Sequence, residues 1–346
     1  MKVIHIESGL GNQMLSFCEY LAIKKVNPTD QCYIETITYD IPECNEVICQ
    51  WNGYELDRIF HLNAPNIREV FSDEAWESIM SDIRASQFWM KNWNYPVYIT
   101  QAFRKAGVDL KNVLGDFEAP GSTCKTTLQL PQYKKTFLFQ YLNFIRRRWL
   151  KKSYAVNRSY EEDLFIQTDD NIFAGQQLFF KYNNRGIERI EKEIREAFTF
   201  PAITDATNLR AAQEITSQQS VAIHARRGDM MSFNFDCYYG GYFKRAVHHI
   251  KSKVNEPTFY IFCDPGSVEW AKSHSKVLGL DFKRDRIQFV DWNSGDDSWR
   301  DMQLMAMCKH QVITRSSFGW WGAFLNTYPD KITCSPDGVY NTTHYF

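Results

Sequence analysis

The sequence predicts an α/β protein with parallel sheets, and three observations support this prediction. Short apolar runs with strand-like composition alternate with helical patterns in the C-terminal part of the chain. The N-terminus has the same order of strand, glycine turn and helix. The 346 residues are also 44% hydrophobic, which is enough apolar material for two domains or one large one. Because strands that alternate with helices are joined by right-handed crossovers, the sheets are expected to be parallel.

The N-terminal part is expected to start with a strand. Val3, Ile4 and Ile6 form a short apolar run, and a glycine-containing turn over 8–13 follows it. Apolar residues then recur at helical spacing over 14–26. The other expectations for this part are a strand over 32–38, helices over 74–83 and 134–151, and no assignment for Trp89, Trp93 and Tyr95.

The C-terminal part has the more regular pattern. A charged helix with one apolar stripe over 187–198 is expected to end before Pro201, and a polar stretch over 204–219 follows it. We therefore expect a boundary between an N-terminal α/β domain of residues 1–203 and a C-terminal domain of residues 204–346. The strands expected in the second domain are 220–224, 258–263, 286–290, 311–314 and 331–334, with helices over 242–250 and 302–309.

Composition argues against several classes of protein. The chain has 40 Lys and Arg against 41 Asp and Glu, a net charge of −1, whereas general nucleic-acid binding needs a basic surface. No apolar stretch approaches the ~18 residues of a membrane helix. Glu7 also ends the N-terminal apolar run too early for a signal peptide, so we expect a cytoplasmic protein. The nine cysteines are expected to be buried thiols, with a disulfide framework or a zinc site as the alternative.

Polar clusters follow three of the expected strands, at the edge where parallel sheets bind ligands. The first cluster is Ser8-Gly9-Leu10-Gly11-Asn12-Gln13. Its two glycines let the backbone approach a ligand, and the helix that follows offers free N–H groups to an anion. Met14 stands where the third glycine of a dinucleotide fingerprint belongs, so a plain tight turn is the alternative interpretation.

The second cluster is His224-Ala225-Arg226-Arg227-Gly228-Asp229, at the end of a buried strand. Adjacent arginines need partners there, because a guanidinium group cannot lose its charge. Both could pair with Asp229 and other carboxylates. Alternatively, one is paired internally while the other binds a phosphate. The position at a strand end favours the second interpretation.

The third cluster is Thr314-Arg315-Ser316-Ser317-Phe318-Gly319-Trp320-Trp321-Gly322, again between strand and helix. Ser316 or Ser317 is expected to cap the helix, whose first amides would face the same crevice. Trp320 and Trp321 are expected to be packing residues. Two arginines and a capped helix terminus together predict a diphosphate site that works without a metal.

Four segments are in register with the motifs of a known family: residues 9–13, 224–229, 301–310 and 316–321. The chain resembles glycosyltransferase family 11, the α-1,2-fucosyltransferases, and in particular their bacterial type. The resemblance covers both ends of the chain and leaves about residues 50–200 uncovered. Arg315 stands where the family usually has Asn, and Gly319 replaces a common Ser.

The resemblance implies a GT-B architecture, two Rossmann-like domains facing a central cleft, with GDP-fucose held mainly by the C-terminal one. Carried over to this sequence, it implies that Arg226 contacts the β-phosphate, His224 the nucleotide and Asp301 the guanine. Ser316 and Ser317 would meet the diphosphate, and Asn12 would approach from the opposite domain. Gly11 and Phe318 complete the expected donor-binding set.

The implied reaction is inverting transfer of L-fucose to the 2-hydroxyl of a galactose-terminated glycan. No Asp-Xaa-Asp tripeptide for a metal occurs, so Arg226, Asn12 and helix amides are expected to stabilise the departing GDP, without a cofactor. Inversion also needs a base at the acceptor hydroxyl. Asp229 is the first candidate and Glu7 the second, although a carboxylate paired with arginine is a poor base.

Three other interpretations stay open. One is another GDP-sugar transferase on the same scaffold, and another is a non-catalytic glycan- or nucleotide-binding module, to which the 15% of aromatic residues could point. The third concerns the basic run over 146–152, preceded by aromatic residues. It is either a solvated helix face or a patch that holds the protein against anionic lipid.

Overall fold

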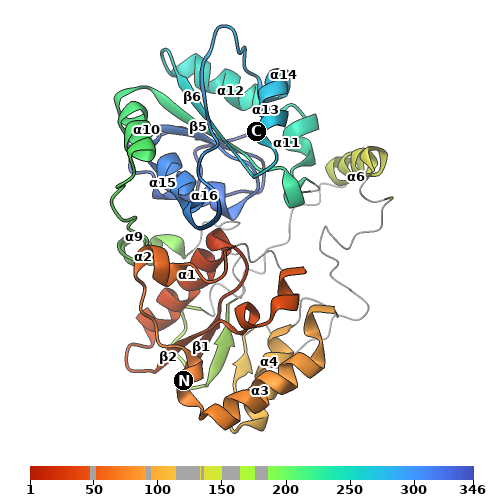
Figure 1. The fold of residues 1–346 in the computed structure, drawn as a ribbon, viewed down its shortest axis with the longest axis vertical. Coiled ribbons are helices and arrows are strands. Elements are labelled where there is room, and N and C mark those ends of the chain that lie inside the picture. Colours follow the sequence, from red (N-terminus) through yellow and green to blue (C-terminus); the bar gives the residue numbers. More distant parts are fainter. Residues whose placement is uncertain are drawn as a thin grey trace. The chain divides into compact units, whose positions relative to one another are not determined.

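The computed structural model describes residues 1–46, 52–90, 95–113, 133, 136–149, 164–175, 186–231 and 233–346. These residues form two compact units, each with its own sheet (Figure 1). Unit 1 contains the described residues of 1–113, 164–175 and 186–199. Unit 2 contains those of 133–149 and 200–346. Every pair of neighbouring strands is parallel in both sheets, which confirms the predicted α/β class.

The sheet of unit 1 has the strand order β2-β1-β4-β3. Val3 of the inner strand β1 (Lys2–His5) pairs with Tyr33 of β2 (Cys32–Glu35) and with Phe173 of β4 (Ile172–Ala174). All four residues of β1 are buried, as suits an inner strand, and Val3 and Ile4 at its centre are apolar. The other elements of this unit are β3 (Lys111–Asn112), α1 (Leu10–Val26), α2 (Leu56–Phe60), α3 (Asp73–Ser86), α4 (Tyr95–Lys105) and α9 (Glu191–Ala197).

Helix α3 confirms the helix expected over 74–83, but two expected boundaries in unit 1 are wrong. Helix α1 begins at Leu10, so Gly11 and Asn12 lie in its first turn. Strand β2 ends at Glu35, because the buried Glu35 carboxylate accepts a hydrogen bond from the backbone N–H of Ile37 and starts a 3₁₀ turn. In the unassigned segment, Trp89 lies in a 3₁₀ turn and Tyr95 begins α4, whereas Trp93 lies outside the described residues.

The sheet of unit 2 has the strand order β10-β9-β8-β5-β6-β7. All five strands expected in this part are confirmed, with ends that differ by two residues at most. The unexpected strand is β10 (His344–Tyr345), which is too short to show a pattern. The strands are β5 (Ser220–Ala225), β6 (Thr258–Cys263), β7 (Arg286–Val290), β8 (His310–Val312) and β9 (Thr333–Ser335). The helices are α6 (Phe137–Trp149), α10 (Ala206–Ser217), α11 (Phe235–Tyr239), α12 (Tyr242–Lys253), α13 (Val268–Ser273), α14 (Ser275–Leu278), α15 (Trp299–Met307) and α16 (Ser317–Leu325).

The polar stretch over 204–219 is not a linker, because most of it forms helix α10. Asp205 caps this helix by accepting a hydrogen bond from the backbone N–H of Asn208 at 2.8 Å. Small or apolar side chains at Ala211, Ala212 and Ile215 are buried at helical spacing. Few large apolar residues lie on this helix, so its pattern could not be recognised in the sequence. The two units divide between residues 199 and 200, four residues before the boundary expected from the sequence.

Helix α6 confirms the helix expected over 134–151, but it belongs to unit 2 although its sequence lies within the first 203 residues. Phe137, Tyr141 and Phe144 on α6 contact Phe235 of α11, and the ring centroids lie 5.8–6.5 Å apart. Contacts between residues about 90 positions apart in sequence cannot be seen in a local pattern, so residues 133–149 depart from the domain limits that the sequence predicts.

In the described part of the chain, no helix is both long enough and apolar enough to cross a membrane. The seven cysteines described there are free thiols, as expected. Each unit has its own apolar core. In unit 2 the core surrounds Val221 and Ile223 of the inner strand β5, whose carboxyl end carries the second polar cluster.

Candidate active site

The carboxyl ends of three neighbouring strands in unit 2 bring the second and third polar clusters together. Ile223 of β5 pairs with Ile261 of β6 on one side and with Val312 of β8 on the other. At the end of these strands, the Thr314 hydroxyl donates to the carbonyl of His224 at 3.2 Å and accepts from the backbone N–H of Arg226 at 3.3 Å. Both clusters therefore lie at one edge of the sheet, the edge at which parallel sheets bind their ligands.

His224 is buried at this edge in its neutral form. Burial and the nearby charge of Arg226 lower the pKa of His224 from 6.5 to about 3, against the opposing effect of Asp264. Its Nδ1 atom has no hydrogen-bond partner. The ring lies against α16, where a Cβ atom at Gly319 would come within 2.3 Å of Nδ1. His224 thus adds no positive charge to this edge of the sheet.

The two adjacent arginines have different surroundings. The guanidinium of Arg227 stacks on Trp270, with its carbon 3.9 Å from the ring centroid. The backbone N–H of Arg227 donates to Asp264 at 2.6 Å, and Asp264 also accepts from Ser267 at 2.8 Å. Arg227 is therefore held by unit 2 itself. The side chain of Asp229, which the sequence also offered as a partner, lies outside the described residues.

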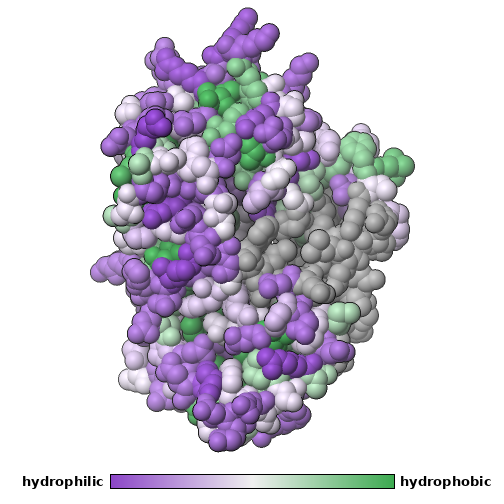
Figure 2. Space-filling view, in the orientation of Figure 1, coloured by the Kyte–Doolittle hydropathy of each residue, from purple (hydrophilic) through white to green (hydrophobic). Residues whose placement is uncertain are grey.

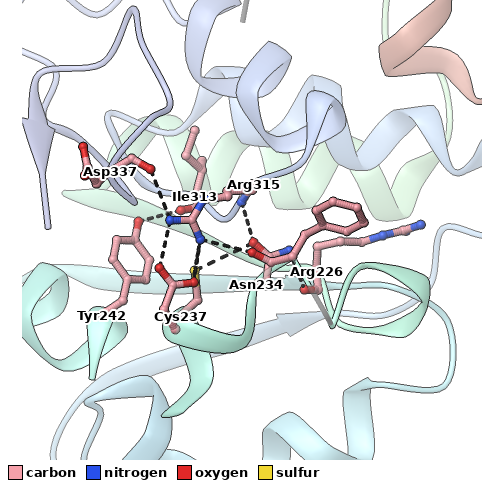
Figure 3. Close-up of polar contacts among 9 residues, drawn as sticks. Arg226, Asn234, Cys237, Tyr242, Ile313, Arg315 and Asp337 are labelled. Atoms are coloured by element: carbon pink, nitrogen blue, oxygen red, sulfur yellow. Dashed lines mark hydrogen bonds and ion pairs between the residues drawn. The ribbon is translucent and has the colours of Figure 1, made fainter. Parts of the chain in front are cut away.

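Arg315 has an internal role as well (Figure 3). Its guanidinium donates to both carboxylate oxygens of Asp236, at 2.5 and 2.8 Å, and to the carbonyls of Phe233 and Asp337 at 3.2 and 3.1 Å. Figure 3 shows the side chain of Arg226 extending away from this group. Arg227 and Arg315 are thus held by Trp270 and Asp236, respectively.

Asn234 joins the two loops that follow β5 and β8. Its Oδ1 accepts from the backbone N–H of Arg315 at 2.8 Å, and its Nδ2 donates to the carbonyl of Arg226 at 3.4 Å. The side chain is fully buried. We call residues 233–236 the loop-bridging segment, because their side chains and backbone connect the loops that follow β5 and β8. Sequence reasoning missed Asn234, Asp236 and Asp264, since single polar residues form no motif.

The start of α16 departs from the expected capping. Ser316 occupies the N-cap position with extended backbone, but its hydroxyl makes no capping hydrogen bond, and Ser317 is the first helical residue. The first backbone N–H groups of a helix lack intrahelical partners, so they need an acceptor from elsewhere. Trp320 and Trp321 are fully buried, which confirms their packing role. The ring of Phe318 lies 5.9 Å from that of His224.

Asp301 lies in the first turn of α15, which follows β7 at the same edge of the sheet. Burial and the charge of Asp291 raise the pKa of Asp301 from 3.8 to about 7, although a hydrogen bond from Asn293 opposes this shift. The Asn293 Nδ2 donates to Asp301 at 2.8 Å, and Asn293 is itself held by Asn208 of α10. A carboxylate oriented in this way is suited to accept N–H groups from a ligand.

In unit 1, the first polar cluster is a rigid helix start. Ser8 has a left-handed backbone, with φ 68°. Its hydroxyl accepts from the Asn12 amide at 3.1 Å, while its carbonyl accepts from Gln13 at 2.9 Å and from the Tyr39 hydroxyl at 2.7 Å. Gln13 also donates to Gly53 at 2.7 Å. Gly11 and Asn12 are thus fixed on the first turn of α1.

Glu7 belongs to a buried charged group in unit 1. His5 contacts the Glu35 carboxylate through Nδ1, and its Nε2 lies 3.6 Å from Glu7. Burial lowers the pKa of His5, but the charges of Glu35 and Glu7 and their hydrogen bonds outweigh it and raise the pKa to about 10. Glu7, the second candidate for the catalytic base, therefore lies beside a charged imidazole in unit 1.

Among the described residues, no three His, Cys, Asp or Glu side chains are grouped as metal ligands. Two units with parallel sheets, one of them with Arg226 and a helix start after its inner strands, agree with the GT-B architecture that the family resemblance implies. The sequence model of glycosyl transferase family 11 matches residues 125–343, so the chain belongs to this family. The resemblance found in the sequence is confirmed, and the match contains the second and third polar clusters but not the first.

Relatives of this chain include two proteins of Escherichia coli. The α-1,2-colitosyltransferase is 29% identical over 204 residues, which cover 56% of this chain and 67% of that protein. The O-antigen biosynthesis glycosyltransferase WbnK is 32% identical over 123 residues, covering 34% and 38%. The human galactoside α-(1,2)-fucosyltransferase 1 is 24% identical over 110 residues, covering 30% and 28%. The similarity thus spans less than half the length of the last two.

Proposed function

We propose that this glycosyltransferase transfers L-fucose from GDP-fucose to the 2-hydroxyl of a galactose-terminated glycan, with inversion and without a metal or other cofactor. The observation that supports this most is that Arg226, His224 and the start of α16 all lie at the carboxyl ends of neighbouring strands. Thr314, just before α16, is hydrogen-bonded to the backbone of both His224 and Arg226. One arginine beside the start of α16 is a suitable receptor for a diphosphate.

The leaving group determines what the donor site has to do. When the bond between the fucose C1 and the β-phosphate oxygen breaks, GDP departs with the electron pair and gains negative charge. Arg226 and the first backbone N–H groups of α16 would stabilise this charge. His224, being neutral, would fix the nucleotide through a hydrogen bond.

The guanine base would be recognised by Asp301. Guanine presents two N–H donors side by side, and a carboxylate accepts both with its two oxygens. The hydrogen bond from Asn293 orients Asp301 for this purpose. Because the pKa of Asp301 is about 7, the ionised form is available above neutral pH. GDP-sugars are therefore the favoured donor class.

The acceptor oxygen would attack C1 on the face opposite to GDP and pass its proton to a base. Asp229 is our candidate for this base, because it follows Arg226 on the same loop. The α-1,2 linkage is supported by the names of two relatives, the colitosyltransferase and the human fucosyltransferase. A different GDP-sugar donor is the second candidate, because one relative, which matches over 204 residues, is named a colitosyltransferase.

A transfer assay tests this proposal. The full chain is incubated with GDP-fucose, GDP-colitose or GDP-mannose, an array of galactose-terminated glycans and EDTA, and the product linkage is determined by NMR. We expect an α-1,2-fucosylated galactoside, and a loss of about 10²–10³ in kcat for Arg226→Ala. Arg284→Ala, at an exposed site, is the control that should remain active. Transfer from only another GDP-sugar, or nucleotide binding without any turnover, would overturn the assignment.

A further inference from the structure

Helix α6 of unit 2 has more apolar surface than its neighbour covers. Phe137, Tyr141 and Phe144 are spaced i, i+4, i+7 and form one stripe, which packs on Phe235 and Tyr239 of α11. The closest pair is Phe137 and Tyr239, with ring centroids 5.0 Å apart. This stripe explains why α6 is attached to unit 2.

A second apolar stripe lies one residue further along the helix, rotated by about 100°. Leu138, Leu142 and Ile145 have the same spacing, and 66%, 55% and 45% of their surfaces are exposed. Figure 2 shows hydrophobic surface over α6 at the side of the molecule. Apolar side chains that are left exposed together on one helix face indicate a binding surface. We call Leu138, Leu142 and Ile145 the outer stripe of α6.

The sequence on either side of the outer stripe carries charge of one sign. From residue 119 to residue 160 the sequence contains nine Lys and Arg residues and no Asp or Glu, in a chain whose net charge is −1. Five of the nine are Arg146, Arg147, Arg148, Lys151 and Lys152. Arg146 to Arg148 form the last turns of α6, whereas Lys151 and Lys152 lie outside the described residues. An apolar stripe beside concentrated positive charge is typical of helices that lie in a membrane interface.

We propose that the outer stripe of α6 binds the surface of an anionic lipid bilayer, with Leu138, Leu142 and Ile145 entering the interface, and that the positive charge of this part of the sequence favours anionic headgroups. A second copy of the chain fits this surface less well. A stable protein interface buries about 800 Å² per partner, whereas a helix about 20 Å long and about 10 Å wide presents roughly 200 Å² in projection. Two strongly basic surfaces would also repel each other.

Vesicle flotation of the full chain tests this proposal. The probe is phosphatidylcholine vesicles with or without phosphatidylglycerol, at low and high salt. We expect binding only to the anionic vesicles, weakened by salt. Leu138→Ser/Leu142→Ser/Ile145→Ser should lower the bound fraction about tenfold, and so should Gln at all five basic positions over 146–152. Circular dichroism melting verifies that both variants remain folded.

Matched controls separate this surface from general hydrophobicity or charge. One control carries Ser at the exposed apolar residues Val70, Met90 and Leu209. The other carries Gln at five exposed basic residues elsewhere, namely Lys105, Lys111, Lys192, Arg284 and Arg286. Both controls should bind as the unaltered chain does. The proposal would be overturned if either the stripe variant or the basic-run variant bound anionic vesicles as well as the unaltered chain does. It would also be overturned if the unaltered chain did not bind vesicles but formed a dimer that the stripe variant no longer forms.

Discussion

Arg315 and Asp236 form a two-pronged ion pair across 79 positions of sequence, with N–O distances of 2.5 and 2.8 Å. Only 11% of the Arg315 side chain is exposed. The pair fastens α11 to the loop after β8, next to the bond from Asn234 to the same loop.

We expect Arg315→Gln and Asp236→Asn each to lower the free energy of unfolding by about 2 kcal/mol, because a charged hydrogen-bonding group loses its partner. The double variant should cost less than the sum of the two single changes. Both single variants should also weaken GDP binding in calorimetry, since the loop that precedes α16 loses its anchor. Urea unfolding of the four proteins gives the coupling energy, and strictly additive effects would contradict the pair's role.

Gly319→Ala is expected to destabilise the protein, although alanine favours helices by about 1 kcal/mol over glycine. The new Cβ atom would approach Nδ1 of His224 to 2.3 Å, and overpacking of this kind costs about 1–3 kcal/mol. His224→Ala/Gly319→Ala should recover the lost stability without recovering GDP affinity. Thermal melting and calorimetry measure both effects. A Gly319→Ala protein more stable than the original would show that the ring is not confined as described.

GDP affinity is expected to fall as the pH is lowered from about 8 to about 6. The pKa of Asp301 is about 7, so protonation removes the carboxylate that would accept the guanine N–H groups. Well below this pKa the loss approaches tenfold per pH unit. The Asp301→Asn protein should bind GDP weakly at pH 8, and its GDP affinity should not show the decrease with pH that protonation of Asp301 causes. If both proteins show the same pH profile, Asp301 does not contact the base.

The stability of unit 1 is expected to decrease as the pH rises from about 7 to about 10. His5 has a pKa of about 10 in the folded protein and 6.5 as its ordinary value, so the folded state holds a proton that the unfolded chain releases. Its contribution is complete below pH 6.5 and is lost as the pH passes through 10, with a slope of at most about 1.4 kcal/mol per pH unit. Urea unfolding should show a shallower slope for His5→Gln. Equal slopes would mean that His5 is not protonated.

The strand positions could be predicted because β-rich apolar runs such as 258–263 and 286–290 are local signals. The rule that ligands bind at carboxyl ends of parallel strands then identified the neighbourhood of Arg226 and Ser316. Helix α10 escaped prediction because alanines cover its buried face. The attachment of α6 to unit 2 depends on aromatic contacts with Phe235, which no local pattern contains.

The candidate site was only partly visible in the sequence for the same reason. Adjacent arginines predicted that one would be held internally, but Trp270, which holds Arg227, lies 43 positions further along the chain. Asn234 and Asp264 are single polar residues whose importance comes from buried hydrogen bonds. Tertiary packing determines which side chains become partners in these hydrogen bonds, and a local sequence motif does not contain that information.

The loop-bridging segment of residues 233–236 has a consequence for efforts to change donor preference by laboratory evolution. Asn234 holds the backbone of both Arg226 and Arg315, so a mutation that moves one loop also strains the other. In libraries that vary one loop at a time, a useful change in one loop would be lost because the other loop lacks the matching change. Randomising positions from both loops together, with Asn234 kept, should recover active variants that stepwise selection misses.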